Sequence, residues 1–379
     1  MGNEKGIRNG ILVAGNITLD ITPVFELEKK AHSVAEVFIP GKVVHMDGMD
    51  IHPGGGASNT GLALKKLGAD VRIIGIIGKD TLGDIIYDFF EEYGATGDLI
   101  IDESVPTSYS IVLAPPGIDR IFLHDPSAAN KLTAEHIDKS LYKSMQIYHY
   151  GYPPISRMLF INEGRGCIEM FSAAKEAGIA TSVDLCAVDP DCESGRTDWY
   201  TIIKKLCPYV DFFEPSIEEL IFYLDRDRYF ELEDEADYGD MIACLSIEDD
   251  IAPLAEQLLE WGAGVVLIKC GYKGMYLACA SEKRLGEIGG DLPFEPGKWA
   301  DKRIFEASYV PDKLLSGTGA GDTTIAAFLY AVLKGYPAEW CVKLAAATGA
   351  SCVESYDALG GLRSFEELTA KINAGWKKQ

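Results

Sequence analysis

A glycine-rich loop that runs directly into a helix is the segment of this sequence best suited to chemistry. The loop reads Gly317-Thr-Gly-Ala-Gly-Asp322, and small and apolar residues in a helical pattern follow it as far as Gly335. Backbone N–H groups at the start of a helix lack partners within the helix, and the helix dipole adds positive potential there. The sequence therefore predicts an anion site built from the amides of Gly319, Ala320 and Gly321.

The acid that ends this loop, Asp322, gives the anion site a specific use. In phosphoryl transfer the negative charge spreads over the transferring group, and the protein contributes mainly positioning and electrostatic stabilisation. We predict that the loop amides hold that charge while Asp322 accepts the proton of an attacking hydroxyl as general base. A Rossmann fingerprint is excluded because it needs glycine where Asp322 stands, and no Gly-Lys-Ser/Thr follows a glycine loop to make a Walker A motif.

Other short segments carry groups suited to a sugar and to nucleotide phosphates. Glycines let the backbone approach a polyhydroxyl ligand closely, and an Asn side chain offers it both a donor and an acceptor. An acid just after the first predicted strand lies where open α/β sheets bind ligands. The candidate substrate-binding residues are Asp20, Gly55, Gly56, Asn59 and Asp322. The candidate phosphate-covering residues are Lys269, Gly271 and Gly274, together with Gly319 and Gly321.

Short apolar runs alternate with helical patterns along most of the chain. Residues 11–15, 71–77 and 265–269 are apolar runs typical of strands buried on both faces. Helical patterns over 62–67 and 85–93 each stop just before a glycine, as helices often do. This alternation predicts an α/β fold with a doubly wound, mostly parallel sheet that helices cover on both faces.

Two stretches interrupt that alternation and predict a small β-sheet lid. Residues 21–52 contain prolines, glycines and short strand-like pieces without a helical pattern. Residues 105–127 contain two extended runs joined by Pro115-Pro-Gly, which is typical of a hairpin. We therefore expect the lid to comprise 21–52 and 105–127. The nucleotide- and substrate-binding core is expected to comprise 1–20, 53–104 and 128–379.

Charge and cysteine usage limit the partners and the location. The 379 residues carry a formal net charge of −23, which disfavours binding to nucleic acids and to anionic membranes. No apolar run approaches the roughly 18 residues that span a bilayer. The chain has nine cysteines without a Cys-x-x-Cys pair and no export signal, so we expect free thiols and a cytoplasmic protein.

Two polar segments account for much of the chain's length. Residues 225–250 contain eleven acids and two arginines. That composition predicts a solvated, partly disordered insertion, with a docking surface for a basic partner as the alternative. Residues 281–308 are also expected to be loop-like.

The sequence resembles the ribokinase-like (PfkB) family of carbohydrate and nucleoside kinases over nearly its whole length. Residues 15–20 resemble the family's first-strand motif, 54–59 its first signature and 316–322 its second. Residues 117–120 and 129–130 resemble the lid hairpin and the segment after it. The resemblance implies transfer of the γ-phosphoryl of ATP to a sugar or nucleoside hydroxyl, with Mg²⁺ and a ribokinase-like fold. It also implies a lid that is either a simple flap or the clasp of a homodimer.

Three positions depart from the family pattern. The family's Asn-x-x-Glu reads Ser216-Ile-Glu-Glu219 here, and the resemblance assigns Ser216 to the nucleotide and Glu219 to Mg²⁺ through a water. Ser316 replaces an Asp that helps to hold potassium in relatives, which argues against strong monovalent-cation dependence. Gly56 stands where kinases of ribose and fructose phosphate often carry Lys. That change disfavours a phosphorylated substrate, unless Arg120 or Lys42 from the lid supplies the charge.

The leading hypothesis is an ATP-dependent kinase acting on an unphosphorylated sugar or sugar acid. A nucleoside kinase is the alternative within the same family, since aromatic residues near the lid could stack on a base. Those residues are Phe25, Phe38, Tyr109, Phe122, Tyr148, Tyr150 and Tyr152. The alternative that is not an enzyme is a sensor that binds a sugar or nucleotide without catalysis. The departures from the family pattern at Ser216 and Ser316 motivate this hypothesis.

Overall fold

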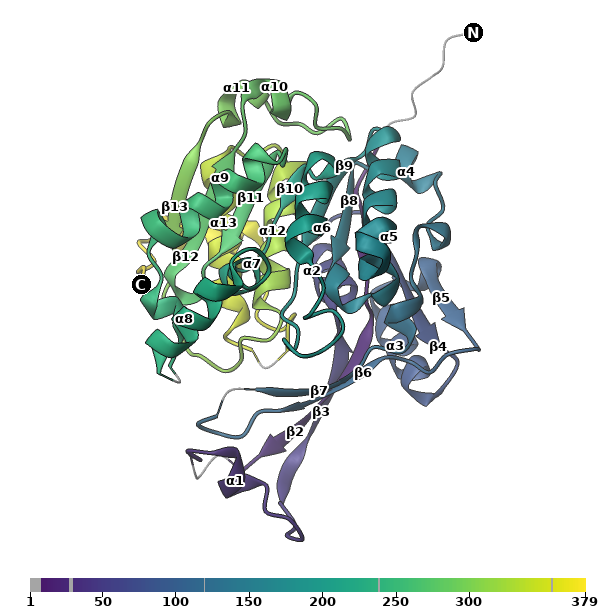
Figure 1. Ribbon diagram of the computed structural model, residues 1–379, viewed down its shortest axis with the longest axis vertical. Helices are drawn as coiled ribbons and strands as arrows, with labels where there is room; N and C mark the ends of the chain where they lie inside the picture. Colours follow the sequence, from purple (N-terminus) through teal and green to yellow (C-terminus); the bar gives the residue numbers. More distant parts are fainter. Residues whose placement is uncertain (1–7, 27–29, 119, 238, 356) are drawn as a thin grey trace.

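A nine-stranded sheet forms the centre of the computed structural model, which describes residues 8–26, 30–118, 120–237, 239–355 and 357–379 (Figure 1). Its strand order is β13-β12-β11-β10-β9-β8-β1-β4-β5. All neighbours run parallel except β11–β12 and β12–β13, which are antiparallel, so the predicted mostly parallel sheet is confirmed. The strands are β1 Ile11–Gly15, β4 Val71–Gly78, β5 Leu99–Asp102, β8 Ile147–Gly151, β9 Ala180–Asp184, β10 Phe212–Phe213, β11 Val265–Lys269, β12 Gly274–Cys279 and β13 Arg303–Ala307.

Helices cover both faces of this sheet, as predicted, because alternate strand residues point to opposite sides. In β1, Leu12 and Ala14 belong to one hydrophobic core, and Ile11 and Val13 belong to the other. The first core packs against α4 Leu141–Ser144, α5 Arg157–Glu176, α6 Trp199–Leu206, α7 Ile217–Leu224, α8 Arg226–Ala236 and α9 Ala252–Glu260. The second packs against α2 Gly56–Leu67, α3 Thr81–Glu92, α10 Glu282–Leu285, α11 Pro296–Trp299, α12 Ala320–Leu333, α13 Ala338–Cys352 and α14 Phe365–Asn373.

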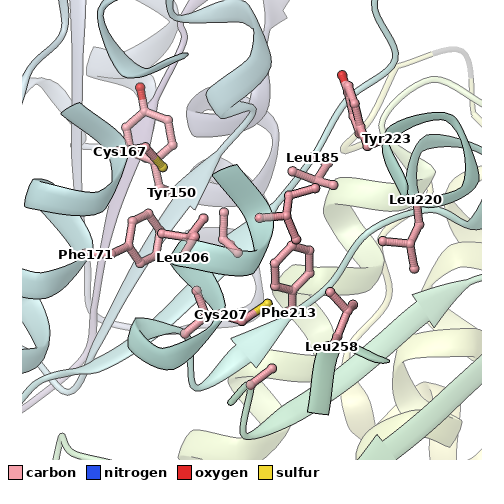
Figure 2. Packing of buried hydrophobic residues seen from close by; sticks show 14 of the residues in the cluster. Tyr150, Cys167, Phe171, Leu185, Leu206, Cys207, Phe213, Leu220, Tyr223 and Leu258 are labelled. Carbon is pink, nitrogen blue, oxygen red and sulfur yellow. The ribbon is translucent and has the colours of Figure 1, made fainter. Parts of the chain in front are cut away.

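The first core shows how closely the helices pack on the strands. Figure 2 shows Phe171, Leu206, Phe213 and Leu258 together, contributed by α5, α6, β10 and α9. All four are 0–1% exposed, so truncating any one of them would leave a cavity. This packing holds the ends of the strands, where the polar side chains gather, in fixed positions.

A second sheet of four strands, in the order β3-β2-β6-β7, lies below the main domain in Figure 1. Its strands are β2 Thr18–Phe25, β3 Met46–Gly54, β6 Tyr109–Leu113 and β7 Ile121–Asp125, and the short helix α1, Val34–Val37, lies between β2 and β3. The pairing of β6 with β7 confirms the predicted hairpin, although Asp119 in its turn lies outside the described residues. The strands β2 and β3 extend into the segments predicted to belong to the core, so Asp20 lies within this small sheet rather than after a core strand.

The two polar segments are more structured than their composition suggests. Within 225–250, the structure places α8 and most of a π-helical turn at 247–251. Leu232 is fully buried, and so is Ile251, which ends that turn just after the segment. Arg228 pairs with Asp250 at 3.0 Å and with Glu235 at 2.7 Å, which neutralises part of the acidity. The prediction of a partly disordered insertion is therefore wrong for the described residues, because charge counting hides the few apolar positions that anchor the segment. Residues 281–308 likewise contain α10, α11 and β13.

Across the described residues, no helix is both long enough and apolar enough to cross a membrane.

Candidate active site

The glycine-rich loop leads directly into α12, as the sequence predicts, but one of the three amides of the predicted anion site already has a partner. Gly319 caps the helix in the left-handed conformation, at φ 71°, and a Cβ on it would lie 2.2 Å from the Cβ of Ala358. Only glycine fits this position, both for its backbone angle and for its space. The amide of Ala320 donates to the Gly317 carbonyl at 3.3 Å, whereas no described residue accepts from the amides of Gly319 or Gly321. The predicted anion site is thus reduced, since Ala320 uses its N–H to close the turn.

Asp322 lies in the first turn of α12 and is almost fully buried. Its Oδ2 accepts a hydrogen bond from Asn59 Nδ2 at 3.0 Å, and its Oδ1 lies 3.4 Å from the Thr60 hydroxyl. The Tyr152 hydroxyl donates to both carboxylate oxygens, at 2.8 Å each. Burial raises the pKa of Asp322 to about 6, although the bonds from Tyr152 and Asn59 favour its charged form. A carboxylate with this pKa can accept a proton near neutral pH.

The glycines of the first predicted signature make a tight junction between β3, α2 and β8. Gly55 precedes α2 with φ 89°, and the side chain of Asn16 accepts a hydrogen bond from the amide of Gly56 at 2.9 Å. A Cβ at Gly56 would lie 2.8 Å from the Cα of Gly151 and 3.2 Å from the ring of Tyr152. Any side chain at position 56 would therefore clash with the backbone of Gly151 and crowd the ring of Tyr152. This junction brings Asn59 to Asp322, as the sequence predicts for residues of one site.

Tyr152 is the member of this group whose role the sequence did not predict. It follows β8 directly and has a positive φ of 68°, which is uncommon for a residue other than glycine. The sequence shows it only as one of several aromatic residues. Its contact with Asp322 depends on the distance between the end of β8 and the start of α12, which no local pattern reveals.

A second polar group lies at the carboxyl ends of β9, β10 and β11, beside the same helix. Lys269 Nζ pairs with Asp184 at 2.6 Å and donates to the Glu214 carbonyl at 2.7 Å. Burial disfavours the Lys269 ammonium, but the neighbouring carboxylates, Asp184 first, outweigh it and raise the pKa of Lys269. A Cβ at Gly321 would lie 3.8 Å from Nζ, so this cation adjoins the open amides. Asp184 ends β9 and Glu214 directly follows β10. An acid at the end of an apolar run is the same pattern that pointed to Asp20, and it could have identified these two residues from the sequence.

Ser216 and Glu219 bind each other at the start of α7. The Ser216 amide donates to Glu219 Oε2 at 2.9 Å, and the Glu219 amide donates to the Ser216 hydroxyl at 3.3 Å. This reciprocal capping box stabilises the helix start and fixes the Glu219 carboxylate. Electrostatic coupling of Glu219 to Asp184, Lys269 and Asp322 shows that all four belong to one charged group.

Gly271 and Gly274 shape the turn between β11 and β12. Both have positive φ, 51° and 127°, and a Cβ at Gly274 would lie 2.1 Å from the Glu306 carbonyl. Packing against β13 therefore explains the glycine at 274, independently of any ligand. Gly271 begins the short 3₁₀ turn that follows Lys269.

The β6–β7 hairpin reaches the glycine-rich loop. Arg120 Nη1 donates to the Thr318 hydroxyl at 3.1 Å, and its guanidinium lies near the position of a Cβ at Gly317. The small sheet and α12 thus enclose a common region. Asp20 lies on this sheet against Gly54, where a Cβ would come within 2.1 Å of its Oδ2.

Comparison with known proteins shows the family of this chain. The model of the pfkB family carbohydrate kinases matches residues 24–363. An uncharacterized sugar kinase of Archaeoglobus fulgidus is 24% identical over 302 residues, which cover 79% of this chain and 98% of that protein. Fructokinase-2 of rice is 28% identical over 187 residues, which cover 46% of this chain and 52% of that enzyme. The chain therefore spans only about half the length of this relative.

The fold recurs in solved structures of low sequence identity. Ribokinase of Thermotoga maritima has a TM-score of 0.67 and 21% identity, with 96% of this chain and 99% of that chain covered. Ribokinase of Arabidopsis thaliana, complexed with ribose and ATP, has a TM-score of 0.66 and 19% identity, with 96% and 98% covered. With the family model covering most of the sequence, the chain belongs to the pfkB family of carbohydrate kinases, phosphotransferases whose acceptor is an alcohol group.

Proposed function

We propose that this protein transfers the γ-phosphoryl of ATP to a hydroxyl of an unphosphorylated sugar or sugar acid. The observation that carries the proposal is the buried Asp322 carboxylate in the first turn of α12, beside the open amides of Gly319 and Gly321. A base and an anion site at one helix terminus are what phosphoryl transfer to an alcohol requires.

On the substrate side, Asp322 takes the proton of the acceptor hydroxyl while the oxygen of that hydroxyl attacks the γ-phosphorus. The bond from phosphorus to the β–γ bridging oxygen breaks, and its electron pair leaves with ADP. Asn59 and Tyr152 hold the carboxylate in place through their hydrogen bonds. Asp20, Gly55 and Gly56 border the region in which the sugar would lie.

On the nucleotide side, the amides of Gly319 and Gly321 face the transferring group, whose negative charge they stabilise. Lys269 adjoins them and stays protonated because of Asp184. We assign Lys269, Gly271 and Ser216 to the neighbourhood of the nucleotide phosphates, with Gly274 supporting the turn. The β6–β7 hairpin acts as a lid that keeps water away from the γ-phosphoryl.

The charges of the site fit a divalent cation. Asp184, Glu219 and Asp322 place three carboxyl groups around the ammonium of Lys269. Burial raises the pKa of Asp184 and of Asp322, and a divalent cation bound among these groups would favour their charged forms. No described cluster of three or more His, Cys, Asp or Glu could hold a metal alone, and Mg²⁺ characteristically binds one or two carboxylates together with phosphates. Glu219, through water, and Asp184 are the groups suited to hold it. Mg²⁺ would neutralise charge on the phosphates.

The test is ADP release from ATP over a panel of neutral sugars, sugar acids and nucleosides. Asp322→Asn keeps the shape of the side chain and removes the base, so kcat should fall about 10²- to 10⁴-fold while the nucleotide still binds. Asn162→Asp, at a solvent-facing turn of α5, is the matched control and should keep full activity. Undiminished turnover in Asp322→Asn would refute the role of this carboxylate.

The same panel separates the alternatives. Tyr148 and Tyr150 are fully buried in the first core, so they are not available to stack on a nucleoside base. Phe122 on β7 is exposed, and preferred phosphorylation of nucleosides would assign it that role. Binding of sugar or ATP without any ADP release would instead indicate a sensor.

A further inference from the structure

Four polar side chains form a row across the small sheet. His52 on β3 pairs with Asp20 on β2, Asp20 pairs with Ser110 on β6, and Ser110 pairs with His124 on β7. Residues paired across strands point to the same face of a sheet. The Ser110 hydroxyl lies 3.1 Å from Nδ1 of His124, and both residues favour the charged form of Asp20, whose pKa is raised by burial. The row therefore lies on one face and forms a connected polar strip.

The strip lies on the face of the small sheet opposite the residues that pack into the second hydrophobic core. Leu19 and Ile21 flank Asp20 in β2 and belong to, or pack against, the second hydrophobic core. Side chains alternate along a strand, so Asp20 points the other way. On that side its carboxylate lies against Gly54, whose missing side chain makes the room for it.

The strip also adjoins the catalytic machinery. Gly54 continues into Gly55 and α2, which carries Asn59 to Asp322. At the other end of the row, the hairpin that carries Ser110 and His124 touches the glycine-rich loop through Arg120 and Thr318. A substrate between the strip and α12 would meet both.

His52 is the member of the strip whose contacts within the protein are incomplete. Its side chain is 13% exposed, and neither ring nitrogen has a hydrogen-bond partner among the described residues. The Asp50 carboxylate lies 3.4 Å from Nδ1, but without hydrogen-bond geometry. A buried polar group left unpaired costs about 1–3 kcal/mol, so such groups usually have a partner that the protein alone does not supply.

We propose, on the basis of the proposed kinase function, that His52 contacts the substrate and determines specificity for a neutral sugar. Asp20 holds one or two hydroxyls, and His52 donates to or accepts from the next one. The strip itself offers carboxylate, imidazole and hydroxyl groups but neither Lys nor Arg, the residues that bind carboxylates and phosphates. Arg120, a lid cation that reaches this region, donates to the Thr318 hydroxyl of the glycine-rich loop rather than to a member of the strip. Among the two classes left open above, this favours neutral sugars over sugar acids.

The test measures KM and kcat of His52→Ala, His52→Asn and the control His45→Ala, with ATP saturating. His45 is an exposed imidazole just before β3. We expect His52→Ala to raise KM for the neutral sugar about 10- to 100-fold, with kcat changed less than about threefold. His52→Asn keeps a donor and an acceptor and should recover part of the loss, and His45→Ala should match the unmodified protein. Equal melting temperatures establish that the variants fold.

Monodeoxy analogues of the sugar identify the hydroxyl concerned. One analogue should lose as much affinity as His52→Ala does, and combining the two should add little further loss, because both remove the same bond. Unchanged KM in a folded His52→Ala, or preferred turnover of sugar acids, would overturn the inference and leave the kinase intact. Absence of ADP release with every compound of the panel would instead refute the proposed function.

Discussion

The hydrogen bonds from Tyr152 to both oxygens of Asp322 make the pKa of the base depend on a residue that follows β8, far from α12 in the sequence. The donor stabilises the charged carboxylate, whereas burial of Asp322 destabilises it. The balance of the two sets the pKa of Asp322 at about 6. Tyr152 is thus a positioning residue that also adjusts the protonation of the base.

This balance predicts a shift of the pH profile. The base acts only when deprotonated, so kcat/KM should fall below about pH 6 as Asp322 takes up a proton. In Tyr152→Phe the charged form loses a donor, the pKa of Asp322 rises, and the acidic limb should move up by about one pH unit. Tyr150→Phe removes a hydroxyl that bonds to Ser156 instead and should leave the limb in place. An unmoved limb in Tyr152→Phe would show that Tyr152 does not control the base.

At the scale of elements, the sequence predicts what is local and misses what depends on strand order. The start of α12 at the glycine-rich loop, the glycines after α2 and α3, and the β6–β7 hairpin follow from nearby residues and are confirmed. The pairing of Lys269 with Asp184 joins the ends of β11 and β9, with β10 between them. Such a contact depends on register and strand order, which one sequence does not display.

A buried chain of hydrogen bonds across strands shows the same dependence. His149 on β8 lies 2.7 Å from the Ser182 hydroxyl on β9, which donates to Glu214 Oε2 at 2.6 Å just after β10. All three side chains are 0% exposed. Burial raises the pKa of Glu214 to about 8 and lowers that of His149 to about 3, so both groups are neutral at pH 7. The chain holds the Glu214 carbonyl that accepts from Lys269.

Neutral Glu214 predicts how stability depends on pH. Between its ordinary pKa of 4.5 and about 8, the folded protein keeps a proton that the unfolded chain has lost. Stability from this group is therefore full below pH 4.5 and is lost as the pH rises to about 8. The side chain of Glu214→Gln stays neutral at every pH. The free energy of unfolding of this variant, relative to that of the unmodified protein, should therefore rise by roughly 2 kcal/mol between pH 6 and 8. Urea unfolding at each pH measures this difference, to which the titration of His149 does not contribute because both proteins contain it. A difference that stays constant with pH would contradict a neutral Glu214.

At the scale of the whole molecule, two sheets of different construction meet at one site. The main sheet brings Lys269 and Asp184, and α12 brings the open amides and Asp322. We propose that the small sheet adds Asp20 to this site. The bond between Arg120 and Thr318 crosses from the small sheet to the loop before α12. An exposed contact of this kind contributes little to folding stability. Its role would therefore be to hold the small sheet closed over the substrate.

If Arg120 helps to hold the lid closed, removing its side chain should weaken the coupling of ATP cleavage to sugar phosphorylation more than it weakens folding. Arg120→Ala should lower kcat/KM about tenfold and raise the share of ATP hydrolysed without sugar phosphate formed, because water then reaches the γ-phosphoryl. Thr318→Val removes the same hydrogen bond from the other side, so the double variant should be little worse than the poorer single one. Arg165→Ala, on the exposed face of α5, serves as the control. Simple addition of the two effects would mean that Arg120 and Thr318 act separately, and the small sheet would then need another contact to hold it closed.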